Sequence, residues 1–225
     1  MSLSIQDIRS IAKYYPELRR DPRFKYALTI IRTVNSLQEF YDEIQKHTGR
    51  ILHITINGWR KSSTLSTENV TPNEHVDVFL TIRNTDRISP YAFYNCLNLQ
   101  KVVIKEPITD IGMSTFQQCK MLKEVVLPDT VTSIGIGAFL SCINLQRIYL
   151  GISLRRIGIG AFSRCSNLKY IFLPDSITNI GVQAFLRSGL EEISIPNTLY
   201  YRFPANVIVT RRETNTNTRE DTLRF

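Results

Sequence analysis

The sequence predicts a solenoid of stacked coils, with a parallel β-sheet on one side and short helices or turns on the other. Three residue types recur with a stride of 23 residues. Their columns are Phe93, Phe116, Phe139, Phe162 and Phe185, then Cys96, Cys119, Cys142 and Cys165, and finally Ile88, Ile111, Ile134, Ile157 and Ile180. Ser188 occupies the fifth position of the cysteine column. The leucine that recurs in each repeat departs from the stride once, because Leu190 follows Leu168 after 22 residues. Independent columns that share one period indicate coils that bury their apolar sides against their neighbours.

The N-terminal quarter, residues 1–50, has a helical pattern and is expected to form an α-helical cap or a docking region. A capping box and three stretches of helical spacing support this, with the last helix beginning at Ser36 and Glu39. The stretch Phe24, Leu28, Ile31 and Val34 is assigned to the second helix. Residues 51–75 are expected to give a capping strand followed by a polar loop that carries the only tryptophan, Trp59.

Residues 76–199 contain six repeats of 22–23 residues. Each opens with an L-x-x-I-x-L strand, as in Leu122, Val125 and Leu127, and the first strand is read as Val76, Phe79 and Thr81. An Ile-Gly pair follows, and its glycine is expected to permit a tight turn into a short helix that buries Ala-Phe and the cysteine. The period ends after residue 199. Residues 200–225 are expected to form a C-terminal cap, with one last strand near 206–210, and a mobile polar tail.

The string L-P-x-x-(I/V)-x-x-I-G-x-x-A-F-x-x-C-x-x-L resembles the BspA-like subfamily of leucine-rich repeats over about residues 76–199. The resemblance implies an α/β solenoid, a right-handed leucine-rich repeat superhelix with its parallel sheet on one face. It also implies binding of proteins or surfaces, not catalysis. It carries no implication for residues 1–50.

Alternation along each strand predicts two outward columns on the sheet. The first is Val78, Lys101, Glu124, Arg147, Tyr170 and Glu192, and the second is Leu80, Val103, Val126, Tyr149, Phe172 and Ser194. A continuous exposed apolar strip marks a contact surface, and aromatic residues beside an arginine are typical of interface hot spots. The same residues would also stabilise a sheet through cross-strand pairing alone. The expected partner-binding residues are Val103, Val126, Tyr149, Tyr170, Phe172, Lys101, Glu124 and Arg147.

The phenylalanine and cysteine columns are expected to be structural core. Metal sites use clustered ligands that converge on one ion, whereas these cysteines occur once per coil. The three histidines, His47, His53 and His75, share no local motif with a nucleophile. We therefore expect no metal, no cofactor and no catalytic residue.

Composition and charge place the chain among globular proteins. Its hydrophobic content of 43% suffices for a core, and the net charge of +8 is spread along the sequence, which argues against nucleic acid as the partner. No apolar run approaches membrane-spanning length, and the N-terminus lacks a signal-peptide pattern. The expectation is a soluble, intracellular protein.

These observations predict a non-catalytic protein-interaction module that binds a protein through its sheet face. Two alternatives stay open. One is an adaptor in which residues 1–50 dock to other machinery while the repeats recruit a target. The other is a structural protein that self-associates through the C-terminal end of its stack.

Overall fold

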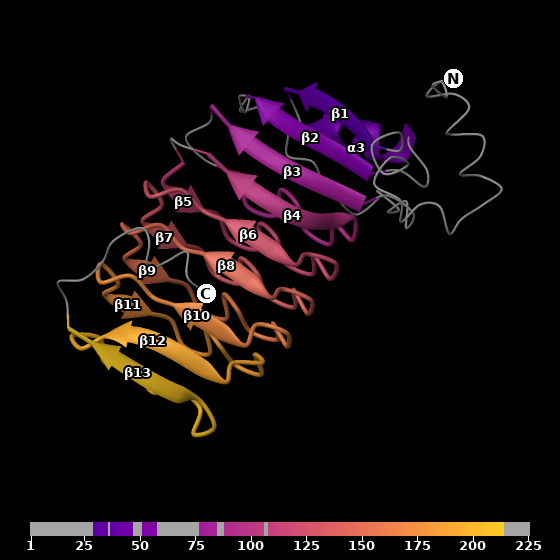
Figure 1. Ribbon diagram of the computed structural model, residues 1–225. Coiled ribbons are helices and arrows are strands. Elements are labelled where there is room, and N and C mark those ends of the chain that lie inside the picture. Colours follow the sequence, from indigo (N-terminus) through magenta and orange to yellow (C-terminus); the bar gives the residue numbers. More distant parts are fainter. Residues whose placement is uncertain are drawn as a thin grey trace, which may run out of the picture.

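Parallel strands stack one over another along the length of the computed structural model, forming a β-solenoid (Figure 1). The structure describes residues 29–35, 37–46, 51–57, 77–84, 88–105 and 108–213. The predicted Trp59 loop and the polar tail beyond residue 213 lie outside these ranges.

The front of the solenoid consists of two parallel sheets. The larger has the order β1 (Thr29–Val34), β2 (Ile51–Asn57), β3 (Asp77–Arg83), β4 (Leu99–Ile104), β6 (Glu124–Val126) and β8 (Arg147–Tyr149). The smaller has the order β10 (Tyr170–Phe172), β12 (Glu192–Pro196) and β13 (Ile208–Arg212). The final strand predicted near 206–210 is thus present, shifted by two residues.

A third sheet lies along one side of the coils, where no strand was predicted. It consists of two-residue strands in the order β11 (Asn179–Ile180), β9 (Arg156–Ile157), β7 (Ser133–Ile134) and β5 (Asp110–Ile111). Each includes the isoleucine of an Ile-Gly pair. Each of these coils therefore runs through a front strand, a two-residue side strand and a run of turns before the next coil begins.

The expected short helices are wrong, because the segments after the Ile-Gly pairs are runs of turns. Each run has two residues in the left-handed region four positions apart, such as Ser114 (φ 52°) and Gln118 (φ 61°). Alternate N–H groups of each run donate to the next coil, whereas the N–H groups between them close turns within the run, as Gln117 N does on Ser114 O. Phe116 N donates to Ala138 O at 2.8 Å, and Phe139 N donates to Ala161 O at 2.9 Å. Bonds between coils replace the bonds that a helix would make within itself.

The described residues contradict the predicted α-helical N-terminal cap, except for its last helix. Residues 29–34, read as helical, form β1, which pairs in parallel with β2. Its sequence, TIIRTV, is rich in β-branched residues that favour extended backbone. The helix predicted from Ser36 onward does form, as α3 (Leu37–Lys46), and it buries Phe40 and Ile44. Residues 1–28 lie outside the described ranges.

The first repeat strand is shifted by one position relative to the prediction. Val78, Leu80 and Ile82 are buried, whereas Phe79 and Thr81 face outward. The pairing skips a residue between β3 and β4: Val78 pairs with Leu99, but Phe79 pairs with Lys101. Because side chains alternate along a strand, one inserted residue reverses the assignment of every position before it.

The five phenylalanines lie inside the coils as one stacked column. Ring centroids of successive members are 5.2–5.6 Å apart, and interplanar angles are 3–7°. All five rings are at most 2% exposed. Other aromatic rings close both ends: Phe40 meets Phe93 edge-on at 5.3 Å, and Phe203 lies 5.9 Å from Phe185. The column is therefore capped by its own chain.

The glycines of the Ile-Gly pairs are required by close approach between coils, which corrects the turn explanation. None of them has a positive φ. A Cβ on Gly158 would lie 2.6 Å from the backbone carbon of Gly135, and one on Gly181 would lie 2.4 Å from Ile159 N. The backbone of each coil rests directly on the glycine of the next, so a side chain has no space there.

Each cysteine after the first ties its coil to the preceding one. The Sγ atoms of Cys119, Cys142 and Cys165 donate to the carbonyl oxygens of Phe93, Phe116 and Phe139 at 3.0, 3.0 and 3.1 Å. All four cysteines are free thiols and buried. Burial raises the pKa of Cys96 and of Cys165 to about 12, so these thiols stay protonated near neutral pH.

Candidate interaction surfaces

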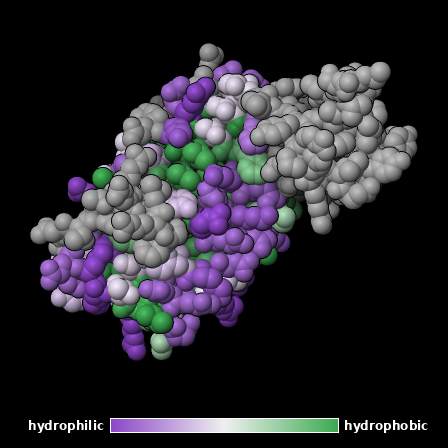
Figure 2. All heavy atoms as spheres, in the orientation of Figure 1, coloured by the Kyte–Doolittle hydropathy of each residue, from purple (hydrophilic) through white to green (hydrophobic). Residues whose placement is uncertain are grey.

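The outward side chains of the front strands, here called the sheet face, form two parallel rows. Strand register places Lys101, Glu124 and Arg147 in the first row and Val103, Val126 and Tyr149 in the second. On β10, Tyr170 pairs with Glu192 and Phe172 pairs with Ser194. Figure 2 shows hydrophobic residues over β4 and β6 bordered by hydrophilic ones. Apart from Val78 and Leu80, the predicted outward residues therefore share this face.

The first row is a chain of alternating charges. Glu124 lies between two cations: its carboxylate is 2.5 Å from Lys101 Nζ and 2.8 Å from Arg147 Nη2. Partial burial would raise the pKa of Glu124, but hydrogen bonds and charge attraction from both cations outweigh it and lower the pKa. Glu124 is thus held ionised, and it fixes both basic side chains across three strands.

The second row is apolar for four coils. Val103, Val126, Tyr149 and Phe172 are all half-buried, and each stands between the first row and the turn that follows its strand. Leu80, predicted as a fifth member, is 1% exposed and belongs to the core. The outward residue there is Thr81, so the apolar row begins at β4.

Arg212 of β13 covers the end of the apolar row. Its guanidinium carbon lies 3.9 Å above the centroid of the Phe172 ring. Its Nη2 is 3.0 Å from Asp175 Oδ1 and also donates to Leu173 O, while Nη1 donates to Ser194 Oγ at 2.9 Å. The predicted hot spot is therefore divided: Tyr149 belongs to the open row, whereas Phe172 lies beneath a fixed arginine.

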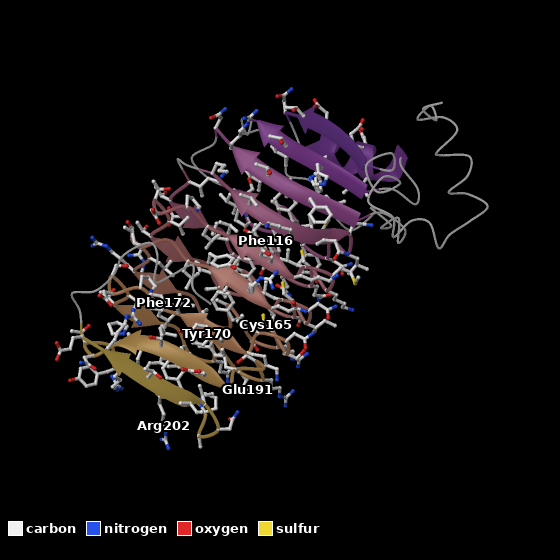
Figure 3. The ribbon with its side chains drawn as sticks, viewed as in Figure 1. Phe116, Cys165, Tyr170, Phe172, Glu191 and Arg202 are labelled. Atoms are coloured by element: carbon white, nitrogen blue, oxygen red, sulfur yellow. The ribbon has the colours of Figure 1, made fainter. Side chains whose placement is uncertain are left out.

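Tyr170 occupies the boundary between the two rows and the C-terminal strands. Figure 3 shows Tyr170 and Phe172 together on β10. Partial burial raises the pKa of Tyr170, and the charge of Glu192 raises it further against an opposing hydrogen bond with Ser194. The phenol therefore stays neutral at physiological pH and can both donate and accept hydrogen bonds.

At the N-terminal end, the sheet face extends onto β2, which was predicted as a capping strand but not as part of the outward columns. His53 of β2 is exposed and stacks on Phe79 of β3, with ring centroids 4.9 Å apart and planes 9° apart. His53 was predicted as a surface residue, and it lies on this face. Among the described residues, no group of three or more His, Cys, Asp or Glu side chains could hold a metal ion.

A second exposed apolar row lies on the opposite side of the solenoid, on the turn segments. It consists of the residues directly after each Ile-Gly pair: Met113, Ile136, Ile159 and Val182, which are 38%, 51%, 51% and 69% exposed. Tyr91 extends it, because its hydroxyl is 3.8 Å from Met113 Sδ. We call these five residues the turn-face row. Sequence reasoning missed it, since only strand positions were assigned an outward direction, although the signal has the same period as the core.

The architecture and these surfaces define a parallel β-solenoid of the leucine-rich repeat class. The model of the BspA type leucine rich repeat region matches residues 86–204 in six copies. The chain belongs to this family.

Solved structures with the same fold come from bacteria. The leucine-rich repeat protein of T. pallidum (TpLRR) is 24% identical, with a TM-score of 0.53 over 71% of this chain and 68% of that one. A leucine-rich repeat protein of Eubacterium ventriosum is 24% identical, with a TM-score of 0.50 over 61% of this chain. The pneumococcal vaccine antigen PcpA is 16% identical, with a TM-score of 0.53 over 75% of this chain. This chain spans 40% of the length of each of the last two.

The curated proteins contain no significant match to the chain. Within the part of the chain that the structure describes, no helix has the length and apolar character that crossing a membrane requires.

Proposed function

We propose that this protein is a non-catalytic module that binds a protein partner through the sheet face. Leucine-rich repeat solenoids generally serve as protein-interaction modules, and this chain has the family's repeats. The observation that carries the proposal is the pairing of an apolar row, Val103–Val126–Tyr149, with a row of fixed charges. Such a surface offers area for burial and charges for selectivity.

Because the first row alternates in sign, its fixed charges favour a partner that presents both positive and negative groups in matching positions. Glu124 is 14% exposed at its side chain, whereas Lys101 and Arg147 are 38% and 49% exposed. The two cations are therefore accessible to a partner, and the carboxylate of Glu124 holds them in place. Since their geometry is set before binding, little side-chain entropy is lost on association.

Site-specific photo-crosslinking tests the proposal. A photoreactive phenylalanine analogue at Val126 should capture one defined protein from the native source, and the same analogue at Gln117, on the turn segments, should not. The double variant Val126→Ala/Tyr149→Ala should abolish capture of that protein by a probe at Val103. Equal capture from both sides of the solenoid, or capture that survives the double variant, would remove the sheet face as the binding site.

Self-association through the C-terminal end is a second candidate, because β13 is an exposed edge. Among the described strands it pairs only with β12, and Ile208 and Val209 are 67% and 36% exposed. An unpaired apolar edge is a template for a further strand. Light scattering across a dilution series should show dimers that Val209→Lys abolishes. A monomer at all concentrations would eliminate this candidate.

The adaptor alternative now concerns a shorter segment. Because β1 and α3 are part of the solenoid, deleting residues 1–50 would remove two structural elements together with any docking region. Deletion of residues 1–28 is the sharper test. An adaptor would lose the partner of residues 1–28 and keep the protein captured at Val126, whereas a pure sheet-face binder would lose no partner.

A further inference from the structure

We infer that the turn face of this solenoid docks on an anionic lipid surface. The inference is independent of the sheet-face proposal, since it concerns the opposite side of the coils. It rests on two observations: the exposed turn-face row, and the charge of the segments that carry it.

The turn-face row forms a continuous apolar line. Parallel pairing of β5, β7, β9 and β11 aligns successive coils, so Met113, Ile136, Ile159 and Val182 follow one another at the strand spacing of about 4.8 Å. Exposure increases toward the C-terminal end, where Val182 is 69% exposed and Leu186 nearby is 43% exposed. A contiguous exposed apolar row of this kind often marks an interaction site.

The last three turn-side segments of the solenoid carry positive charge alone, although charge appears evenly spread along the whole sequence. The turn-side segments 131–143, 154–166 and 177–189 contain no Asp or Glu, and their charged residues are Arg155, Arg156, Arg164 and Arg187. All four arginines are exposed. The strand-side segments carry both signs, including Glu124, Asp129, Asp175, Glu191 and Glu192, and so does the earlier turn-side segment 108–120, which contains Asp110 and Lys120. Folding the repeat therefore concentrates positive charge beside the apolar row.

The arrangement of these charges matches an interfacial element. Arg156, on β9, comes three residues before Ile159, and Arg164 comes five residues after Ile159 on the same turn segment. Arginines therefore flank the row on both sides. At a bilayer, such a row inserts among the acyl chains while flanking arginines reach the headgroup phosphates. Anionic lipid supplies the negative potential that the arginines complement.

Other occupants fit less well. A second copy of the chain would bring its own four arginines against these, and the turn-side segments 108–120, 131–143, 154–166 and 177–189 offer one carboxylate, Asp110, to neutralise them. An extended peptide needs a groove, whereas one outward residue per coil makes a ridge. A membrane surface can contact such a ridge at several coils at once.

Vesicle flotation with the full chain tests the inference. The probes are phosphatidylcholine vesicles and vesicles in which about a third of the lipid is phosphatidylserine. We expect binding to the anionic vesicles only, weakened by salt. Ile136→Ser/Ile159→Ser should weaken binding about tenfold for each isoleucine. Arg156→Gln/Arg164→Gln should weaken it about fivefold for each arginine.

Matched variants on the sheet side separate this site from general attraction to a cationic protein. Lys105→Gln/Lys123→Gln removes the same charge as the arginine pair and should leave vesicle binding within about twofold of wild type. Val126→Ser/Tyr149→Ser should also leave vesicle binding intact, although it removes the partner of the sheet face. Circular dichroism confirms that each variant is folded.

Three results would overturn the inference: equal binding to both vesicles, equal losses in the arginine and lysine pairs, or binding that survives the isoleucine pair. Binding of soluble polyglutamate without vesicle binding, lost in the arginine pair, would also overturn it. That result would assign the turn face to an acidic protein.

Discussion

Gly158 and Gly160 lie two residues apart in one coil, and the structure predicts different consequences for replacing each with alanine. A Cβ on Gly158 would meet Gly135 C and Ile136 N at 2.6 Å and Gly135 O at 2.8 Å. A Cβ on Gly160 has only Ser163 Cβ at 4.0 Å nearby, but its backbone is left-handed, with φ of +60°. A side chain at position 158 is excluded by lack of space, whereas a side chain at position 160 is disfavoured by the left-handed backbone conformation.

The magnitudes follow from these two limits. Carbon contacts are comfortable at about 3.5–4.0 Å, so Gly158→Ala must push two coils apart by about 1 Å. The hydrogen bond from Gly158 N to Ile134 O, now 2.7 Å, would then exceed bonding distance. Overpacking and one lost buried hydrogen bond together cost about 3 kcal/mol. Gly160→Ala costs about 1 kcal/mol, since alanine disfavours the left-handed region but also restricts the unfolded chain.

Thermal unfolding followed by circular dichroism measures the difference. For a chain of this size, Gly158→Ala should lower Tm by about 6–12 °C and Gly160→Ala by about 2–4 °C. The equivalent positions support this ranking, because Ser114 and Gln183 occupy the Gly160 position with φ of 52° and 57°. Equal shifts for the two variants, or a smaller shift for Gly158→Ala, would refute the contact argument.

Three further predictions concern titration and the C-terminal cap. Burial raises the pKa of Cys165 from 9.0 to about 12, so its protonated form stabilises the fold below pH 9 and this contribution is lost between pH 9 and 12, at up to about 1.4 kcal/mol per pH unit. Urea unfolding of Cys165→Ala should decline less steeply across that range than wild type; parallel declines would contradict the assignment. The lowered pKa of Glu124 stabilises the fold above pH 4.5, and this contribution, about 0.5–1 kcal/mol, is lost as pH falls through the folded pKa. Glu124→Gln should remove that part of the acid dependence in urea titrations, and an unchanged pH profile would show that the charge row is not formed in solution. Arg212→Ala should destabilise the chain by about 2–4 kcal/mol, because the largely buried Asp175 loses its charge partner and Phe172 loses its cover. Hydrogen exchange should accelerate in β13 but not in β4, and uniform protection would argue against the cap.

The repeat pattern predicted the family, the core columns and the sheet face because these depend on local spacing. Phe139 is followed by another phenylalanine 23 residues later, and any stacking of equal coils brings the two rings together. Lys101, Glu124 and Arg147 were likewise placed in one row by alternation along equally spaced strands. Periodicity is a property of the chain itself, so these relations follow from it directly.

The first coil and the N-terminal region could not be read in this way. Phe79 and Leu80 exchanged roles because one extra residue separates the strands, and only the pairing between β3 and β4 reveals it. Residues 29–34 carry apolar spacing compatible with a helix, and pairing with β2 decides that they form β1. Short apolar segments are ambiguous until the neighbours that supply their hydrogen bonds are known.

By itself, the sequence determined the period, the residues that fill each coil and the alternation that turns half of each strand outward. Only the tertiary structure decided how closely the coils approach, and this close approach leaves room for nothing larger than glycine at position 158. The tertiary structure likewise decided which distant residue covers Phe172. It also gathered arginines from separate coils beside one apolar row. Spacing along the chain determines whether a side chain points into its own coil or out of it. Contacts between coils depend on how the coils pack against one another in the complete stack.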